Sequence, residues 1–297
     1  MNAIGPDSPW TRRDFIKTSA VAAGAAATRH IEEAVAENTA PAQKVIGIQA
    51  GAVSFVDEGV DRVLDVFQEK GSVNTIFLAT FTYGRGIGGR QVPGQPLPDH
   101  GKQEYDPDFH GGNFATPHRQ FYAGTVLQDT RAPDHGKLDI IDHVLDKAHR
   151  RDMKVYCWYE DVFSGAVPNI QKLTEVDLYG RKARTLCPYN PDYRSFLIGL
   201  TEDYCKSYDI DGVMWGCERQ GPLNNALGSR HGGKPDPTKV TCFCEHCQNE
   251  AMQRGINIDR ARKGYEALAG FVTQALAGTR PNDGYFVAFW RLLLDYP

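Results

Sequence analysis

The chain has 297 residues, a net charge of −4 and a hydrophobic fraction of 41%, values that are ordinary for a globular protein. Beyond the N-terminal segment it has no run of basic residues, which argues against nucleic acid as the main partner. No later stretch is long and apolar enough to predict a membrane-spanning helix, which needs about 20 apolar residues.

The first 40 residues have the pattern of an export signal. Arg12 and Arg13 are followed by Phe15, Lys17 and a weakly hydrophobic, alanine-rich run at 18–27. A basic front with a short apolar middle is typical of signal peptides. We therefore expect residues 1–40 to be a twin-arginine signal peptide and linker, recognised by the Tat translocon, which places the protein in the periplasm or outside the cell. The alternative is a basic tail in which the arginine pair occurs by chance.

From residue 41 on, strand-like and helix-like segments alternate. Short apolar runs predict strands at 45–50, 75–81, 154–159 and 211–215. Apolar residues at helical spacing predict helices at 57–70, 138–151, 191–208, 260–276 and 285–294. The segment 83–131 is rich in Gly, Pro, His and Asp and has no period, as expected for a long functional loop.

Four β-then-α units in succession predict a parallel sheet covered by helices. An open doubly wound sheet loses support because no glycine-rich phosphate loop follows the first strand. We expect residues 41–297 to belong to a (β/α)8 TIM barrel of the glycoside-hydrolase type. Eight units need about 250 residues, so only about the first four βα units would be present. The chain would then be an N-terminal fragment, or else a half-barrel that pairs with another chain, for example as a homo-oligomer.

Seven cysteines are present, and an odd number in an exported protein argues against a framework made only of disulfides. Cys157, Cys205 and Cys217 lie in apolar strand or helix contexts, where a cysteine is expected to act as a small core residue.

Cys242, Cys244 and Cys247 lie within six residues of each other, a spacing that allows three thiolates to meet at one metal ion. Structural zinc takes four ligands in a tetrahedron. The candidates for the fourth ligand are Cys187, His246, Cys217 and His231. Cys187 is favoured because it lies in a neighbouring loop, whereas the adjacency of His246 to Cys247 would strain the site. A disulfide with a spare thiol and an iron–sulfur cluster are the alternatives.

Three motifs in this order resemble glycoside hydrolase family 42 β-galactosidases and uncharacterised hydrolase-like barrel proteins related to them. The motifs are Cys187-Pro188-Tyr189-Asn190-Pro191-Asp192-Tyr193-Arg194, Trp215-Gly216-Cys217-Glu218, and the Cys-x-Cys-x-x-Cys at 242–247. The resemblance implies that Cys187, Cys242, Cys244 and Cys247 bind one zinc ion. It also implies that Glu218 is the general acid/base at the end of the fourth barrel strand. The family has asparagine before that glutamate, whereas this chain has Cys217, which leaves open a different sugar or another chemistry.

Glycoside hydrolysis with retention uses two carboxyl groups about 5 Å apart. Glu218 is the candidate acid, and an apolar wall such as Trp215 would raise its pKa by desolvation. Glu160 and Asp161 end the third strand, where they are expected to bind sugar hydroxyls, while Trp158 and Trp215 offer flat faces for stacking. Core packing of the aromatic residues, and an ion pair of Glu218 with a nearby arginine, are the alternatives. The resemblance places the nucleophile on a seventh strand that is not recognisable in the sequence, so the chain alone is expected to be inactive.

These features predict a carbohydrate-active enzyme that cleaves O-glycosyl bonds of an oligo- or polysaccharide. One alternative is a sugar isomerase or epimerase barrel, which would need a divalent metal held by Glu, Asp and His. The other is a barrel that binds carbohydrate without catalysis.

Overall fold

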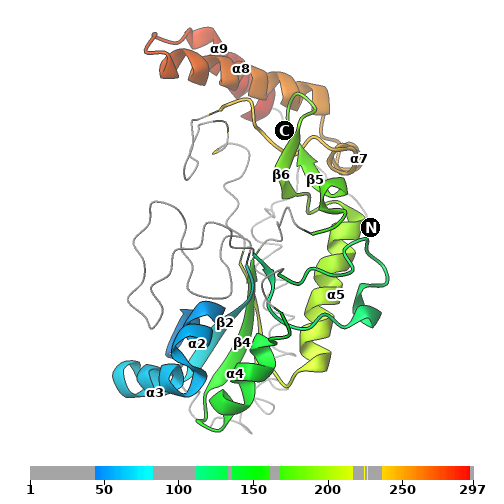
Figure 1. Cartoon of the computed structure of the whole chain (residues 1–297). Coiled ribbons are helices and arrows are strands. Elements are labelled where there is room, and N and C mark those ends of the chain that lie inside the picture. Colours follow the sequence, from blue (N-terminus) through cyan, green and yellow to red (C-terminus); the bar gives the residue numbers. More distant parts are fainter. Residues whose placement is uncertain are drawn as a thin grey trace, which may run out of the picture. The chain divides into compact units, whose positions relative to one another are not determined.

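The computed structural model of the chain describes residues 44–82, 111–132, 136–160, 167–216, 224, 226 and 236–294 (Figure 1). Six residues with expected or candidate roles lie outside these ranges, namely Arg12, Arg13, Asp161, Cys217, Glu218 and His231. Most of the long loop expected after the second strand also lies outside them.

A parallel sheet forms the centre of the fold. Its strands are β1 (Gly47–Ala50), β2 (Thr75–Thr82), β4 (Lys154–Glu160) and β7 (Gly212–Gly216), and they are neighbours in this order. A short strand, β3 (Gly112–Asn113), pairs with β2 in antiparallel fashion. The mixed α/β class with a parallel sheet is therefore confirmed. In the described ranges the sheet has β1 and β7 at its ends, so closure into a barrel stays a prediction.

The helices between the strands are α2 (Ala52–Glu58), α3 (Val60–Gly71), α4 (Ile140–His149) and α5 (Pro191–Ser207). The helix expected at 57–70 is confirmed as α3, although it begins at Val60, and the preceding helix α2, which was not expected, ends just before Gly59. This residue has a φ of 85°, a conformation that glycine adopts without steric cost and that interrupts helical geometry. Polar N-caps begin α4 and α5, where the side chains of Asp139 and Asn190 each accept two backbone N–H groups.

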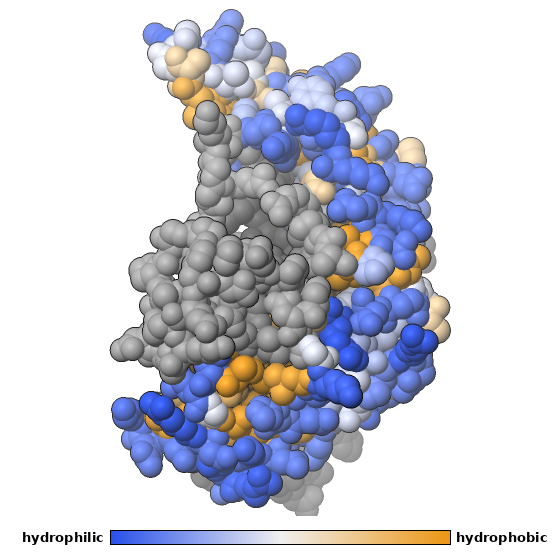
Figure 2. Space-filling model, viewed as in Figure 1, coloured by the Kyte–Doolittle hydropathy of each residue, from blue (hydrophilic) through white to orange (hydrophobic). Residues whose placement is uncertain are grey.

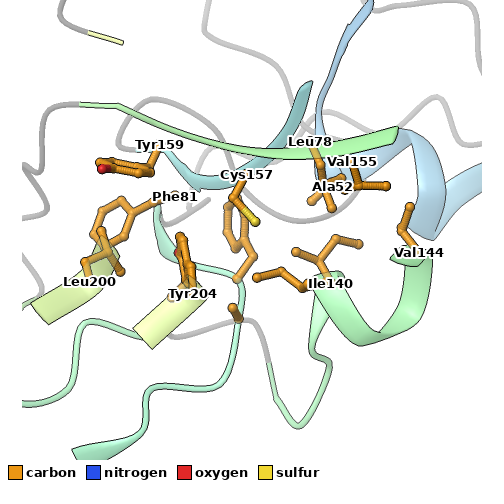
Figure 3. Packing of buried hydrophobic residues seen from close by; sticks show 14 of the residues in the cluster. Ala52, Leu78, Phe81, Ile140, Val144, Val155, Cys157, Tyr159, Leu200 and Tyr204 are labelled. Atoms are coloured by element: carbon orange, nitrogen blue, oxygen red, sulfur yellow. The ribbon is translucent and has the colours of Figure 1, made fainter. Parts of the chain in front are cut away.

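One face of the sheet packs against these helices. Figure 3 shows strand residues such as Leu78 and Cys157 meeting helix residues such as Ile140 and Tyr204. Cys157 is fully buried, as expected. The same expectation for Cys205 is wrong, because this residue lies on the exposed side of α5, one position past the buried Tyr204.

The chain then forms a hairpin and a group of helices. The hairpin comprises β5 (Thr174–Val176) and β6 (Lys182–Leu186), and it was not expected from the sequence. The helices are α7 (Glu245–Gln253), α8 (Ile258–Leu276) and α9 (Asp283–Phe289), and α9 continues into a π-helical turn, η4 (Trp290–Leu294). A second hydrophobic cluster includes Leu178, Val240 and Phe243 together with apolar residues of α8 and α9.

The coloured surface in Figure 2 is mostly hydrophilic, with hydrophobic patches between. Among the described helices, none combines the length and the hydrophobicity that crossing a membrane would require.

Candidate metal centre and the carboxyl edge of the sheet

Four cysteines from two distant segments meet in one group. Cys187 follows β6, and Cys242, Cys244 and Cys247 lie at the start of α7. Their four Sγ atoms all lie within 4.8 Å of one another. The Sγ of Cys187 is 3.4 Å from that of Cys247 and 3.5 Å from that of Cys244. The structure therefore brings together the four residues that the sequence singles out, and they are able to hold a metal ion.

Backbone contacts bring these two segments to the hairpin. The N–H of Cys187 donates to the carbonyl of Leu173 at 2.9 Å, directly before β5. On the other side, the N–H of Phe243 donates to the carbonyl of Val176 at 2.8 Å. The hairpin thus fixes the spacing between the first cysteine and the other three.

Hydrogen bonds among the four thiols shift their pKa values in different directions. The thiol of Cys187 lowers the pKa of Cys244 through a hydrogen bond, and contact with the same residue raises the pKa of Cys247. Neighbouring thiols cannot all ionise without a cation, because like charges at this distance repel. A divalent ion would remove that restriction and bind all four as thiolates.

Four sulfur donors fit zinc, which prefers tetrahedral thiolate ligation in structural sites, with Zn–S bonds of about 2.3 Å. Four thiolates leave no position open for a reacting water, so such an ion would have a structural role. His246 is not part of the group, because its ring lies next to Glu245 instead.

The carboxyl ends of β4 and β7 carry the other expected site residues. Their register pairs Trp158 with Met214 and Glu160 with Gly216. Side chains alternate along a strand, so Trp158 and Glu160 share the face that does not carry α5. Both are buried, with 9% and 8% of their surface exposed.

Trp215 lies on the opposite face. It pairs with Tyr159, whose hydroxyl is 2.7 Å from Thr201 on α5. Trp215 is half exposed there. Trp158 and Trp215 therefore point to different faces of the sheet, and their expected role in sugar binding stays a prediction.

Another aspartate, Asp211, lies directly before β7, at the amino ends of the strands. Asp211 accepts a hydrogen bond of 2.8 Å from the backbone N–H of Val155, at the start of β4. Its carboxylate also lies 3.1 Å from the ring nitrogen of His149. These contacts of Asp211 join β4, α4 and the start of β7 and so have a structural role.

Sequence reasoning missed Glu175, a buried carboxylate next to the ligand-bearing segments. It accepts hydrogen bonds from Thr185 and Thr241. The glycine of the turn, Gly180, is a local signal for a hairpin here, but no pattern in the sequence marks Glu175 as buried.

Comparison with known proteins identifies no family for this chain. No family description matches it, and neither does any curated protein. Among solved structures, it is similar to the maltogenic alpha-amylase AmyB from Thermotoga neapolitana, with a TM-score of 0.36 and 16% identity. The match covers 63% of this chain and 42% of the amylase, so the chain spans less than half of that protein. A similarity at this level establishes neither family nor activity.

Proposed function

We propose that the chain is a glycoside hydrolase of the (β/α)8 barrel type that carries a structural zinc ion and acts on an oligo- or polysaccharide. The observation that carries this proposal is the group formed by Cys187, Cys242, Cys244 and Cys247. These residues are the most specific part of the resemblance to glycoside hydrolase family 42. The short distances among their four sulfur atoms support zinc binding more strongly than the positions of the cysteines in the sequence do.

The strand register supports the proposed catalytic role of Glu218. Gly216 pairs with Glu160 at the ends of β7 and β4, and Glu218 follows Gly216 by two positions in the sequence. Glu160 is thus the last residue of β4, at the carboxyl edge of the sheet where barrel enzymes place their active sites, and in the sequence Glu218 comes soon after the end of the neighbouring strand. We assign Glu160, Asp161 and Trp158 to substrate binding.

In this role Glu218 donates its proton to the glycosidic oxygen while the bond from that oxygen to the anomeric carbon breaks and the nucleophile expected on the seventh strand bonds to that carbon. Water then displaces the nucleophile from the anomeric carbon and gives its proton to the Glu218 carboxylate, which restores the acid. The buried side chain of Trp158 would favour the protonated form of the Glu218 carboxyl group before the reaction, if it lies beside that group and shields it from water.

Among the described residues, the only group of three or more metal-ligating side chains is the cysteine group. An isomerase or epimerase would require oxygen and nitrogen ligands, whereas four sulfur donors suit a structural ion.

We further propose that Arg12 and Arg13 direct export through the Tat translocon, with the mature protein in the periplasm or secreted. Zinc thiolate sites need reduced thiols, and metal binding contributes to folding. Loading zinc in the reducing cytoplasm and exporting the folded product would protect these thiols from oxidation. The other proposed partners are a carbohydrate substrate and further copies of the chain in a homo-oligomer. Nucleic acid is not among them.

Release of nitrophenol from a panel of 4-nitrophenyl glycosides tests the hydrolase proposal, in a protein that also includes the nucleophile expected on the seventh strand. We expect Glu218→Gln to abolish release, whereas Glu266→Gln, a change at an exposed position of α8, leaves it unaltered. Unchanged turnover in Glu218→Gln would overturn the assigned role. Sugar binding by the wild-type protein without release from any glycoside would support the carbohydrate-binding alternative instead.

Metal analysis tests the zinc site separately. We expect about one zinc per purified chain, and loss of that zinc in Cys244→Ser. Wild-type protein purified from zinc-supplemented cells without bound metal would overturn the metal site.

A further inference from the structure

The strand β5 lies between the two segments that carry the cysteines. On one side it pairs with β6, where Thr174 is the partner of Leu186, the residue before Cys187. On the other side, Asp177 forms an antiparallel bridge with Thr241, the residue before Cys242. A side chain on β5 that contacts both of these segments is therefore able to set the distance between Cys187 and Cys242.

Glu175 makes both contacts with a single carboxylate oxygen. Its Oε2 accepts a hydrogen bond from the hydroxyl of Thr241 at 2.8 Å and another from the hydroxyl of Thr185. The side chain is buried, with 8% of the residue exposed. Thr241 is adjacent to Cys242 and Thr185 is two residues before Cys187, so the carboxylate ties together both segments close to their sulfur donors.

We propose that Glu175 is a positioning residue of the metal site, which holds Cys187 and Cys242 in the geometry that the ion requires. This inference rests on the zinc site proposed above. Tetrahedral ligation demands four sulfurs at about 2.3 Å from one point, so a small rotation of either segment moves a donor off the metal. Partners that orient ligands in this way commonly change metal affinity by about 10- to 100-fold when removed.

The hairpin has other contacts that maintain its fold without this carboxylate. The guanidinium of Arg181 donates to Asp177 at 2.6 Å and to the hydroxyl of Thr238 at 2.7 Å. The backbone bond from Phe243 to Val176 is also independent of Glu175. Loss of one threonine hydroxyl should therefore leave the hairpin folded, and its effect should appear in metal binding.

Isosteric substitution of Thr241 tests the proposal. Thr241→Val removes the hydroxyl and keeps the shape, while Thr241→Ser keeps the hydroxyl. Zinc affinity is measured by competition with a chromophoric chelator, and the geometry of the site by the absorption spectrum of the protein loaded with Co²⁺. We expect Thr241→Val to bind zinc about tenfold or more weakly with an altered Co²⁺ spectrum, and Thr241→Ser to match the wild type.

Two further variants make the result specific. Thr201→Val removes a hydroxyl from α5 that bonds Tyr159, away from the cysteines, and should leave zinc affinity unchanged. In protein that already carries Glu175→Ala, Thr241→Val should weaken binding less than it does alone, because the hydroxyl acts through the carboxylate. If Thr241→Val fails to fold, Thr185→Val provides the same test from the other segment.

The outcomes separate the two proposals. A wild-type protein that takes up neither zinc nor Co²⁺ overturns the metal site itself, and this inference with it. A wild-type protein that binds zinc, with Thr241→Val and Thr185→Val binding equally tightly, overturns only the role of Glu175.

Discussion

A Cβ atom placed on Gly212 would lie 2.5 Å from Cε1 of Tyr156. The two residues are partners in the parallel pairing of β7 with β4, so the ring lies directly over the glycine. We expect Gly212→Ala to destabilise the protein by about 1–3 kcal/mol, because the ring must shift within a packed sheet. Unfolding in urea, followed by circular dichroism, measures the loss.

Gly124→Ala is the matched control, since a Cβ there would lie 4.0 Å from its nearest neighbour, on Ser195. The cost of Gly212→Ala should also shrink in a Tyr156→Ala background, where no ring opposes the new methyl group. An equal cost in both backgrounds would contradict the steric explanation.

The carboxylate of Asp203 organises a buried network on α5. It accepts hydrogen bonds from the backbone N–H of His118 at 2.9 Å, the hydroxyl of Tyr122 at 2.9 Å and that of Ser207 at 2.8 Å. The ring of His118 also lies 2.7 Å from it. Asp203→Ala should cost on the order of 3 kcal/mol, because several donors lose their acceptor. The melting temperature of Asp203→Ala is measured by thermal unfolding. The control is Asp209→Ala, a change at an exposed position. Equal melting temperatures of the two variants would contradict the prediction.

Two cysteines outside the metal group should differ in reactivity. Burial raises the pKa of the Cys157 thiol, whereas Cys205 is exposed on α5. Only the thiolate reacts with iodoacetamide, so we expect Cys205 to be alkylated at pH 8 while Cys157 is protected. Peptide mass spectrometry measures the alkylation of both cysteines in the native protein. The control is protein unfolded in guanidinium, in which both cysteines should react. Rapid modification of Cys157 in the native protein would contradict its place in the core.

Removal of zinc should loosen one part of the protein selectively. The cysteine group joins the β5–β6 hairpin to the start of α7, whereas β2 and β4 belong to the first hydrophobic cluster. After treatment with a chelator, we expect faster amide exchange in 174–186 and 242–253, with β2 and β4 still protected. Hydrogen–deuterium exchange with mass spectrometry measures this, and re-addition of zinc should restore protection. Uniformly faster exchange throughout would show that the metal stabilises the whole protein rather than this junction.

The sequence predicts the strands and longer helices well because they carry strong apolar patterns. β2 and β4 are short apolar runs, and α5 repeats Phe196, Leu200 and Tyr204 on one face. Cys205 follows Tyr204 by one residue, about 100° around the helix, which explains why its apolar context was a poor guide to burial.

The details of the site depend on contacts that sequence patterns do not encode. The grouping of Cys242, Cys244 and Cys247 is visible in their spacing, and Cys187 follows from the resemblance. The anchoring of both segments on Glu175 depends on a short hairpin whose strands have three and five residues. Such short strands carry little periodic signal. The hydrogen bond from the Thr241 hydroxyl to Glu175 joins residues that are 66 positions apart, and no sequence pattern indicates it.

Cys187 and Cys247 lie 60 residues apart in the sequence, and the segment between them contains α5 and β7. A metal ion bound at both ends would join the ends of this segment in the folded protein. Because such a site forms only on folding, the free energy of metal binding would add to the free energy of folding. That contribution grows with the concentration of free zinc, so the stability of the strand that precedes Glu218 would follow the supply of the metal.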